Sequence, residues 1–394
     1  MTEESDPTRA ARQRRSKGTV DTFSGSRLSV ARRMARLPRT ELAHRVGVTP
    51  TAITQLERGY NKPTTTVAAG LSLALGVPRE FLERSVAAQP IAASTAHFRS
   101  LRSTPALSRE QALAFAELGL ELLTTVEDYV DLPAPNLPSL EHHDVTTAAG
   151  LQAAATEARH HLGVADGPVP NVVRLLETHG VFVLRFPDDQ VDPQVDAFST
   201  TATVRPLVVM SPLKNDKARS RFDVAHELGH LVLHAEAEPG SKVVEHQAHS
   251  FAAAFLTPAD QIADDLPRRL DWQAFHDAKR RWGVSLKALL YRARTLGLIT
   301  DGTYRRGNIQ LTQWGNPEPG PLGPPEQPSL LGTATELLLQ HGITVAQLAN
   351  HAAMPTETAE HLIAAATDLR PSITANARDA GPDAPNTPSF GTRR

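Results

Sequence analysis

Hydrophobic positions in the first hundred residues recur at helical spacing, in short segments that glycine and proline separate. The apolar positions of the expected helices are Leu28, Ala31, Met34 and Ala35 in the first, Leu42, Ala43 and Val46 in the second, Ala52, Ile53 and Leu56 in the third, and Val67, Leu71, Leu73 and Leu75 in the fourth. Pro38 interrupts the first helix, and Gly47 is a residue type that favours the left-handed backbone at a helix C-terminus. The pattern predicts a compact all-α domain over residues 23–90, preceded by a flexible basic arm over residues 1–22.

After residue 140 the pattern mixes helical segments with short apolar runs that are typical of strands. Helices are expected over residues 148–162, 172–177, 217–235 and 243–256, and strands over residues 181–184, 196–200 and 207–210. A helical connector over residues 91–144 joins the first domain to a second domain over residues 145–300. Six prolines between Pro317 and Pro328 predict a Pro-rich linker over residues 301–330, followed by a C-terminal helical segment over residues 331–370 and a disordered tail over residues 371–394. The predicted fold class is therefore α+β and multidomain.

With 394 residues the chain has the length of two or three domains. It contains no cysteine, which excludes a disulfide scaffold, thiolate zinc ligands and cysteine nucleophiles. Any metal must therefore be bound by histidines and carboxylates. The lack of cysteine agrees with a reducing cytosol, and no apolar run approaches membrane-spanning length, so we expect a cytoplasmic protein with no membrane partner.

Charge is divided unevenly between the two ends of the chain. Residues 1–82 carry 14 Lys or Arg against 7 Asp or Glu, whereas residues 83–394 carry 27 against 36. Because only the N-terminal part has a positive net charge, we expect that part to bind a polyanion.

The sequence His226-Glu227-Leu228-Gly229-His230 carries the most chemical information. On a helix, residues four apart share a face with Cβ atoms about 5–6 Å apart, so His226 and His230 can bind one zinc ion. Glu227 lies beside that face, where its carboxylate can accept a proton from a zinc-bound water. A preceding β region and apolar flanks favour such a site over a chance occurrence of the motif on an exposed helix.

A catalytic zinc needs a third protein ligand and one open position. The segment from Glu245 to Ala252 supplies candidates on a second helix, where Glu245 shares its face with alanines that let two helices approach. Glu245 is the predicted third ligand, and His249 is either a rival ligand or a group that supports a ligand by hydrogen bonding. His234 lies about 12 Å along the helix from His226 and is not expected to be a ligand.

Two further patterns carry less information. The pairs His142-His143 and His160-His161 are interpreted as surface residues rather than metal ligands. The segment from Gly342 to Leu362 weakly resembles a second helix-turn-helix, and we interpret it as a packing or oligomerising helix pair.

The metal motifs resemble the ImmA/IrrE family of zinc metallopeptidases. The segments that carry the resemblance are Phe222–Leu231, Glu245–Ala252 with Pro258, Gly167-Pro168, Leu176-Glu177 before Gly180-Val181, Asp196–Ser199, Trp282–Ser285 and Leu289–Ala293. The resemblance covers residues 145–300 and implies a mainly helical, zincin-like domain with a small β-sheet. It also implies that His226, His230 and Glu245 bind Zn²⁺ and that Glu227 is the catalytic base of a metallo-endopeptidase. Members of this family are implicated in cleaving helix-turn-helix repressors, so the expected protein substrate is such a repressor or an antitoxin.

Residues 27–82 resemble the Xre/Cro-type helix-turn-helix, through Glu41-Leu42-Ala43, Val46-Gly47-Val48, Ile53–Gly59 and Gly76-Val77-Pro78. The resemblance implies that the third helix enters the major groove of a double-stranded DNA operator. The residues expected to contact DNA are Arg39, Thr49, Thr51, Thr54, Gln55 and Lys62. Such domains usually bind half-sites as dimers, so a homodimer is a further expectation, although no clear heptad seam specifies one.

The combined interpretation is a transcriptional regulator whose DNA-binding domain is fused to a peptidase-like domain that hydrolyses a peptide bond in a repressor or antitoxin. The protein's own N-terminal domain is another candidate substrate. A non-catalytic regulator whose zinc domain senses a ligand or partner is an alternative, and a member of a toxin–antitoxin or phage-repressor pair is a third. All three predict DNA binding, and the motifs alone do not separate them.

Overall fold

The computed structural model describes most of the chain. The described residues are 19–83, 90–98, 105–186, 195, 197–211, 216–234, 237 and 240–367. The flexible arm expected over residues 1–22 lies outside them up to residue 18, as do Asp196 of one expected strand and the whole tail expected over residues 371–394.

The N-terminal domain is a bundle of short helices, as the sequence predicts. They are α2 (Gly25–Met34), α3 (Arg39–Val46), α4 (Pro50–Glu57), α5 (Thr65–Leu75) and the shorter α6 (Arg79–Glu83). Ser24, Thr49 and Thr64 cap the N-termini of α2, α4 and α5 by accepting backbone hydrogen bonds. Gly47 ends α3 in the left-handed conformation with φ of 72°.

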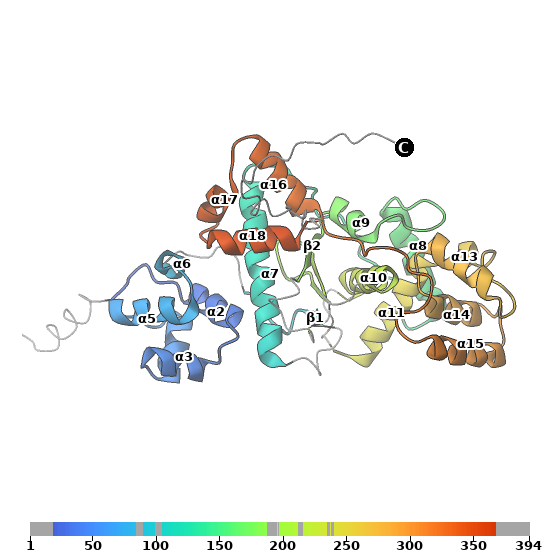
Figure 1. Cartoon of the computed structure of the whole chain (residues 1–394), viewed down its shortest axis with the longest axis horizontal. Coiled ribbons are helices and arrows are strands. Elements are labelled where there is room, and N and C mark those ends of the chain that lie inside the picture. Colours follow the sequence, from blue (N-terminus) through green and yellow to red (C-terminus); the bar gives the residue numbers. More distant parts are fainter. Residues whose placement is uncertain are drawn as a thin grey trace, which may run out of the picture.

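A four-stranded sheet lies near the middle of the molecule (Figure 1). Its strands are β1 (His97–Phe98), β2 (Phe182–Arg185), β3 (Phe198–Thr200) and β4 (Leu207–Met210), in the order β1-β3-β4-β2. β2 and β4 are parallel, and the other two pairs are antiparallel. The sequence predicts β2, β3 and β4. It does not predict β1, which lies in the connector expected to be helical, because two residues are too short to produce a periodic pattern.

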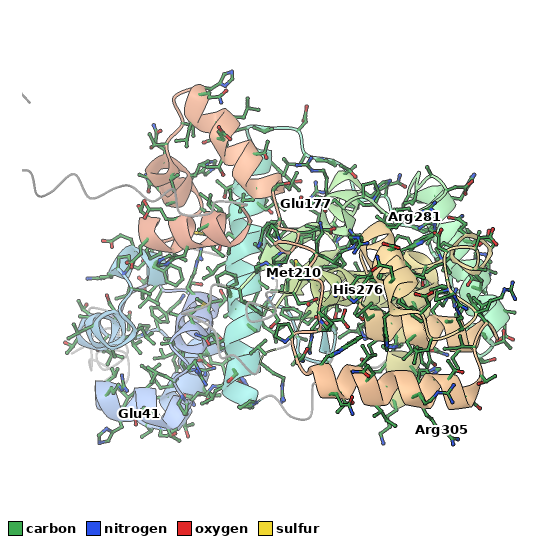
Figure 2. All side chains as sticks on the ribbon, turned by 45° about the vertical axis from the view of Figure 1, so that its right-hand side comes forward. Glu41, Glu177, Met210, His276, Arg281 and Arg305 are labelled. Carbon is green, nitrogen blue, oxygen red and sulfur yellow. The ribbon has the colours of Figure 1, made fainter. Side chains whose placement is uncertain are left out.

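Helices cover both faces of this sheet, and side chains fill the space between the layers (Figures 1 and 2). The helix α7 (Ala106–Glu127) packs on one face, against Leu184 of β2 and Val209 of β4 among others. The opposite face, with Val183 and Val208, packs in the core that also contains α10 (Lys217–Leu233). Successive strand residues point to opposite faces, so β2 and β4 each contribute to both cores, whereas Phe198 of β3 packs in the core on the α7 side.

The remaining helices pack on α10, on one another or on α7. α9 (Val172–Thr178) and α11 (Lys242–Leu256) pack on α10, and α8 (Ala148–His161) packs on α11. After the short α12 (Ala259–Ile262), α13 (Trp272–Trp282) packs on α14 (Leu286–Thr295), and α14 packs on α15 (Asp301–Trp314). The helices that pack on α7 are α16 (Leu330–Gln340), α17 (Val345–His351) and α18 (Thr356–Ala365). The Pro-rich linker expected over residues 301–330 is therefore wrong in its first half, which forms α15. Thr300 caps this helix, and the prolines begin only at Pro317.

The proline-rich segment that follows α15 is tightly bound to the second domain. Glu318 accepts hydrogen bonds from Lys279 Nζ (2.6 Å) and from the backbone N–H of Leu286 (2.8 Å), at the start of α14. Glu326 is only 6% exposed, pairs with the buried Arg221, and accepts a hydrogen bond of 2.7 Å from the N–H of Val172 at the start of α9. The prolines therefore hold two helix-capping carboxylates in place, which a free linker would not do.

The N-terminal domain is docked on α7 by arginines of α2. Arg27 is fully buried, pairs with Glu121 of α7, and also donates to the backbone oxygen of Ala352 (3.2 Å). Arg33 pairs with Glu117 of α7, which is 6% exposed. Buried ion pairs lose much more when one partner is removed than exposed pairs do, so these contacts fix where the N-terminal domain sits.

Among the described helices, none combines the length and the apolar character that a bilayer crossing requires.

The Glu326 contacts give a stability prediction. Replacing Glu326 by Ala leaves the buried Arg221 guanidinium without its counter-charge, so we expect the free energy of unfolding to fall by about 3–5 kcal/mol. Urea unfolding followed by circular dichroism measures the change. The control is Glu336→Ala, which removes an exposed glutamate of α16 and should change stability by less than about 0.5 kcal/mol. Equal effects of the two substitutions would contradict the role given to Glu326.

Candidate metal centre and nucleic-acid interface

α10 presents three ionisable side chains toward the interior of the second domain. Asp216 starts this helix by accepting a hydrogen bond from the N–H of Arg219 (2.8 Å). His226, Glu227 and His230 follow on its buried part and are 2%, 0% and 1% exposed. Buried polar groups of this kind need partners, which the neighbouring elements supply.

The helix α11 brings Glu245 to the two histidines. A Cβ on Gly229 of α10 would lie 3.2 Å from the Cα of Ala248 on α11, so the small residues at this crossing allow a close approach of the helices. Glu245 then reaches His226 Nε2 at 3.3 Å and His230 Nε2 at 3.4 Å. The two Nε2 atoms lie 3.1 Å apart.

These three side chains fit a zinc ion. Ligand atoms bound tetrahedrally to zinc at 2.0–2.1 Å are separated from one another by about 3.3 Å. The observed separations of 3.1, 3.3 and 3.4 Å agree with this value. Two imidazoles and one carboxylate form a His₂Glu set that leaves a fourth position for water or substrate. His226, His230 and Glu245 are thus the candidate metal ligands.

Glu227 is oriented by a serine of the sheet. Ser199 of β3 is fully buried, and its hydroxyl donates a hydrogen bond of 2.6 Å to Oε2 of Glu227. The carboxylate is therefore held beside the candidate metal ligands by a residue from another element. Ser199 lies in one of the segments that resemble the family, but no sequence pattern assigns it a role, because the contact depends on how β3 packs on α10.

His249 does not join the three candidate ligands. It is exposed on α11, and its ring packs against Phe222 with centroids 4.7 Å apart. His234 lies at the end of α10, where its Nε2 is 3.0 Å from Oε1 of Gln247.

The strand β1 contributes a histidine that no sequence motif predicts. The ring of His97 stacks on that of His230, with centroids 4.5 Å apart and an interplanar angle of 15°. His97 is 5% exposed. No local motif identifies it, since its sequence position lies more than a hundred residues before His230.

Burial and the neighbouring charges shift three pKa values in this centre. Burial raises the pKa of Glu245, but hydrogen bonds from His226 and His230 more than offset it and bring it to about 2. Burial, together with the nearby His230, lowers the pKa of His97 to about 4. The same two causes lower the pKa of His234 to about 4. The low pKa of Glu245 keeps its carboxylate ionised, which is the form of this ligand that metal binding requires.

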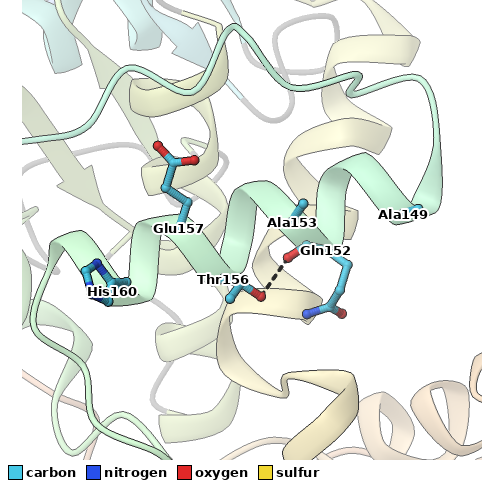
Figure 3. Close-up of a pocket in the computed structure, with 6 residues that line it drawn as sticks. All are labelled: Ala149, Gln152, Ala153, Thr156, Glu157 and His160. Atoms are coloured by element: carbon cyan, nitrogen blue, oxygen red, sulfur yellow. Dashed lines mark hydrogen bonds between the residues drawn. The ribbon is translucent and has the colours of Figure 1, made fainter.

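A second group with two histidines and a glutamate lies at the surface. His142 and His143 both place Nε2 near Oε2 of Glu157, at 3.2 and 2.8 Å. Glu157 also lines a surface pocket along α8, with Ala149, Gln152, Ala153, Thr156 and His160 (Figure 3). Glu157 and Gln152 extend from opposite sides of the helix. None of the residues that line this pocket belongs to the buried centre of His226, Glu227, His230 and Glu245, and we assign the pocket no chemistry.

The residues expected to contact DNA gather at α4, α3 and the turn after α4. Thr51 is exposed, whereas Thr49 caps α4 through a hydrogen bond from the N–H of Ala52 (3.1 Å). Thr54 donates to the backbone oxygen of Pro50 (3.1 Å), and Gln55 accepts from Asn61 Nδ2 (2.7 Å). Thr51 is therefore the member of this helix whose hydroxyl is most available to a ligand.

The two cationic members of that set are engaged within the protein. Arg39 donates to Glu57 (2.6 Å), and Lys62 Nζ donates to the backbone oxygen of Phe23 (2.5 Å). Contact with phosphate requires each to exchange or share these bonds. The Arg39 side chain remains 47% exposed, so a phosphate can reach it.

The shift at His234 predicts a pH dependence in metal-free protein. Since its pKa falls from 6.5 to about 4 on folding, the unfolded chain binds a proton between these pH values that the native protein does not. Stability should therefore decrease as pH falls from 6.5 to 4, by up to about 1.4 kcal/mol per pH unit from this group. His234→Phe should reduce the slope in urea unfolding at pH 7, 6 and 5, and His160→Phe, at an exposed histidine, should not. Parallel slopes for all three proteins would contradict this account.

Comparison with protein families identifies both domains. Residues 30–82 match the family model of the helix-turn-helix, and residues 176–294 match that of the IrrE N-terminal-like domain, a peptidase family. No curated protein matches the chain. The two matched ranges contain α4 and the candidate metal centre respectively. The chain is therefore a DNA-binding regulator in which an Xre-type helix-turn-helix domain is fused to a metallopeptidase-like domain of the ImmA/IrrE family.

Proposed function

We propose that this protein binds operator DNA through α4 and hydrolyses a peptide bond in a helix-turn-helix repressor or antitoxin at the buried metal centre. One observation carries the catalytic part. The three ligand atoms lie at tetrahedral spacing next to a glutamate that a serine holds in place. The substrate class follows from the family resemblance.

Zn²⁺ is the cofactor that the donor set fits, with His226, His230 and Glu245 as its ligands. When bound, zinc supplies Lewis acidity, which lowers the pKa of a water toward 7 and polarises a carbonyl oxygen. Glu245 supplies the negative charge that two neutral imidazoles lack. Its low pKa keeps it ionised throughout the physiological range.

Glu227 acts as the general base. Its carboxylate is fully buried, and the hydrogen bond from Ser199 occupies Oε2, which fixes the carboxylate plane. A base held in this way accepts a proton from water without first losing conformational freedom. The proton then goes to the leaving amine, because the same carboxylate, once protonated, is a general acid.

The DNA-binding part rests on α4 and its N-terminal residues. Helices of this type insert their N-terminal part into the major groove. Thr51 lies in the first turn of α4, and Thr54 and Gln55 follow in its second half, on the face opposite the buried Ile53 and Leu56. Gln55 is the residue that can contact an adenine edge with two hydrogen bonds, after releasing Asn61. A homodimer places two such helices on half-sites about one helical turn apart.

The first test measures zinc and proteolysis together. Purified wild-type protein should contain about one zinc per chain, Glu245→Ala should lose most of it, and Glu227→Gln should retain zinc but lose cleavage of co-expressed helix-turn-helix repressors. Loss of the general base should slow cleavage by roughly 10²–10⁴-fold. Elemental analysis and gel mapping of the fragments give the two readouts.

His143→Ala is the matched control for this test, because it removes a histidine from the surface His₂Glu group and leaves the buried group intact. It should retain both zinc and cleavage. Zinc without cleavage in the wild-type protein would favour the non-catalytic sensor. A protein without zinc would remove the basis for the peptidase.

The second test concerns DNA. Gln55→Ala should weaken binding to a DNA site selected by the wild-type protein by about 1–3 kcal/mol, while leaving affinity for random DNA nearly unchanged. Lys62→Ala should lower the slope of log affinity against log salt by about one. The control is Thr66→Ala on the exposed side of α5, which should affect neither. If the Gln55→Ala protein binds the selected site as tightly as the wild-type protein does, α4 is not the helix that contacts the DNA bases.

A further inference from the structure

The strand β1 lies against the metal centre at the edge of the sheet. It pairs antiparallel with β3, with His97 opposite Ser199 and Phe98 opposite Phe198. Ser199 is the residue that holds Glu227, and His97 stacks on His230. The two-residue strand β1 therefore contacts both Ser199, which donates the hydrogen bond to Glu227, and His230, a candidate metal ligand.

The centre is closed to a peptide while β1 is in this position. His226, Glu227 and His230 are 2%, 0% and 1% exposed, and only Glu245 has appreciable contact with solvent, at 24% of its side chain. A scissile peptide bond must come within hydrogen-bond reach of Glu227. An extended peptide gains affinity by adding to an unpaired sheet edge, and the edge of β3 nearest this centre is already paired with β1.

The segment that carries β1 is also tied to the DNA-binding domain. The N–H of Ile91 donates a hydrogen bond of 2.8 Å to Oε1 of Glu117 on α7. The same carboxylate pairs with Arg33 of α2. Nearer the strand, Thr200 donates to the backbone oxygen of Thr95 (2.8 Å). Glu117 thus holds both the docked helix α2 and the start of the β1 segment.

We propose that β1 occupies the edge of β3 at which a substrate peptide binds, as an internal occupant of that edge. Detachment of β1 from β3 admits an extended peptide to the metal centre. This detachment is coupled, through Glu117, to the docking of α2 on α7. This inference rests on the proposed peptidase function, since it concerns access to the same site. The occupant and the substrate have the same chemistry, an extended polypeptide backbone that pairs with β3. Release of α2 from α7 weakens the contact that positions Ile91, and so favours the open state.

The lack of cysteine allows a direct test. In the register of β1 and β3, residues 96 and 200 form the next pair outward. Antiparallel partners have Cα atoms about 4.5–5.5 Å apart, which suits a disulfide. Ala96→Cys with Thr200→Cys therefore locks β1 onto β3 when oxidised, and reduction releases it within the same protein. The single substitution Ala96→Cys is the control for any effect of oxidation itself.

Peptide binding is measured without catalysis, in a Glu227→Gln background loaded with zinc. The probe is a fluorescent peptide with the sequence of residues 91–98, which competes with β1 for the edge of β3. We expect the reduced double variant to bind it about tenfold or more tightly than the oxidised form, because affinity scales with the fraction of molecules in the open state. Equal binding before and after reduction would overturn the proposal.

Glu117→Ala tests the coupling to α2. It should raise the affinity for the probe peptide by about tenfold relative to the protein that keeps Glu117. Its matched control is Glu110→Ala, which removes another α7 partner of α2, paired with Arg32 at 3.3 Å. Glu110 is not the residue that bonds Ile91. Equal effects of the two substitutions would overturn the coupling. The redox experiment does not depend on this variant, so it stands if Glu117→Ala does not fold.

The outcomes separate this inference from the peptidase itself. If probe binding depends on the redox state but the protein cleaves no repressor, the proposal that β1 occupies the edge of β3 is supported and the proposed peptidase activity is contradicted. Cleavage of a repressor at the same rate in oxidised and reduced protein, with the Glu227 side chain restored, would support the peptidase and overturn the internal occupant.

Discussion

The need to cover both faces of one small sheet organises this protein. Two of its strands, β2 and β4, carry apolar side chains on both faces, and each face must be buried against a helix. α7 covers one face and α10 the other. As a result, the helix that docks the DNA-binding domain and the helix that carries the candidate metal ligands are attached to the same strands. β3 lies between the two regions, and its Ser199 reaches Glu227.

Buried charge gives this arrangement its specificity. Arg27 and Arg33 of α2 lie almost fully inside the protein, paired with Glu121 and Glu117 of α7. Burial raises the pKa of Glu121 even though Arg27 beside it acts in the opposite sense. Such pairs contribute little net stability compared with apolar packing, but a shifted or detached α2 would leave uncompensated charges. The DNA-binding domain therefore has one favoured position, and departures from it carry a large cost.

Much of the fold is accessible from the sequence, because amphipathic helices and apolar, β-branched runs produce recognisable local patterns. The helices of the N-terminal domain, α8 to α11 and three of the four strands appear near their expected positions. The exceptions have physical causes. β1 is too short to be periodic, and α15 lies in a region whose prolines come only after it. Glu326 is an ordinary acidic residue by its sequence context, and its burial depends on Arg221, about a hundred residues away.

The sequence alone determined the residue types of the metal centre and part of its geometry. The spacing of His226 and His230 puts both on one face because helical periodicity is local, and the lack of cysteine restricts the ligands to imidazole and carboxylate. Tertiary structure decided the rest. The reach of Glu245 depends on how closely α11 crosses α10 at Gly229, and the positions of Ser199 and His97 depend on strand pairing. Contacts between distant segments follow from packing and register, which no local pattern of residues specifies.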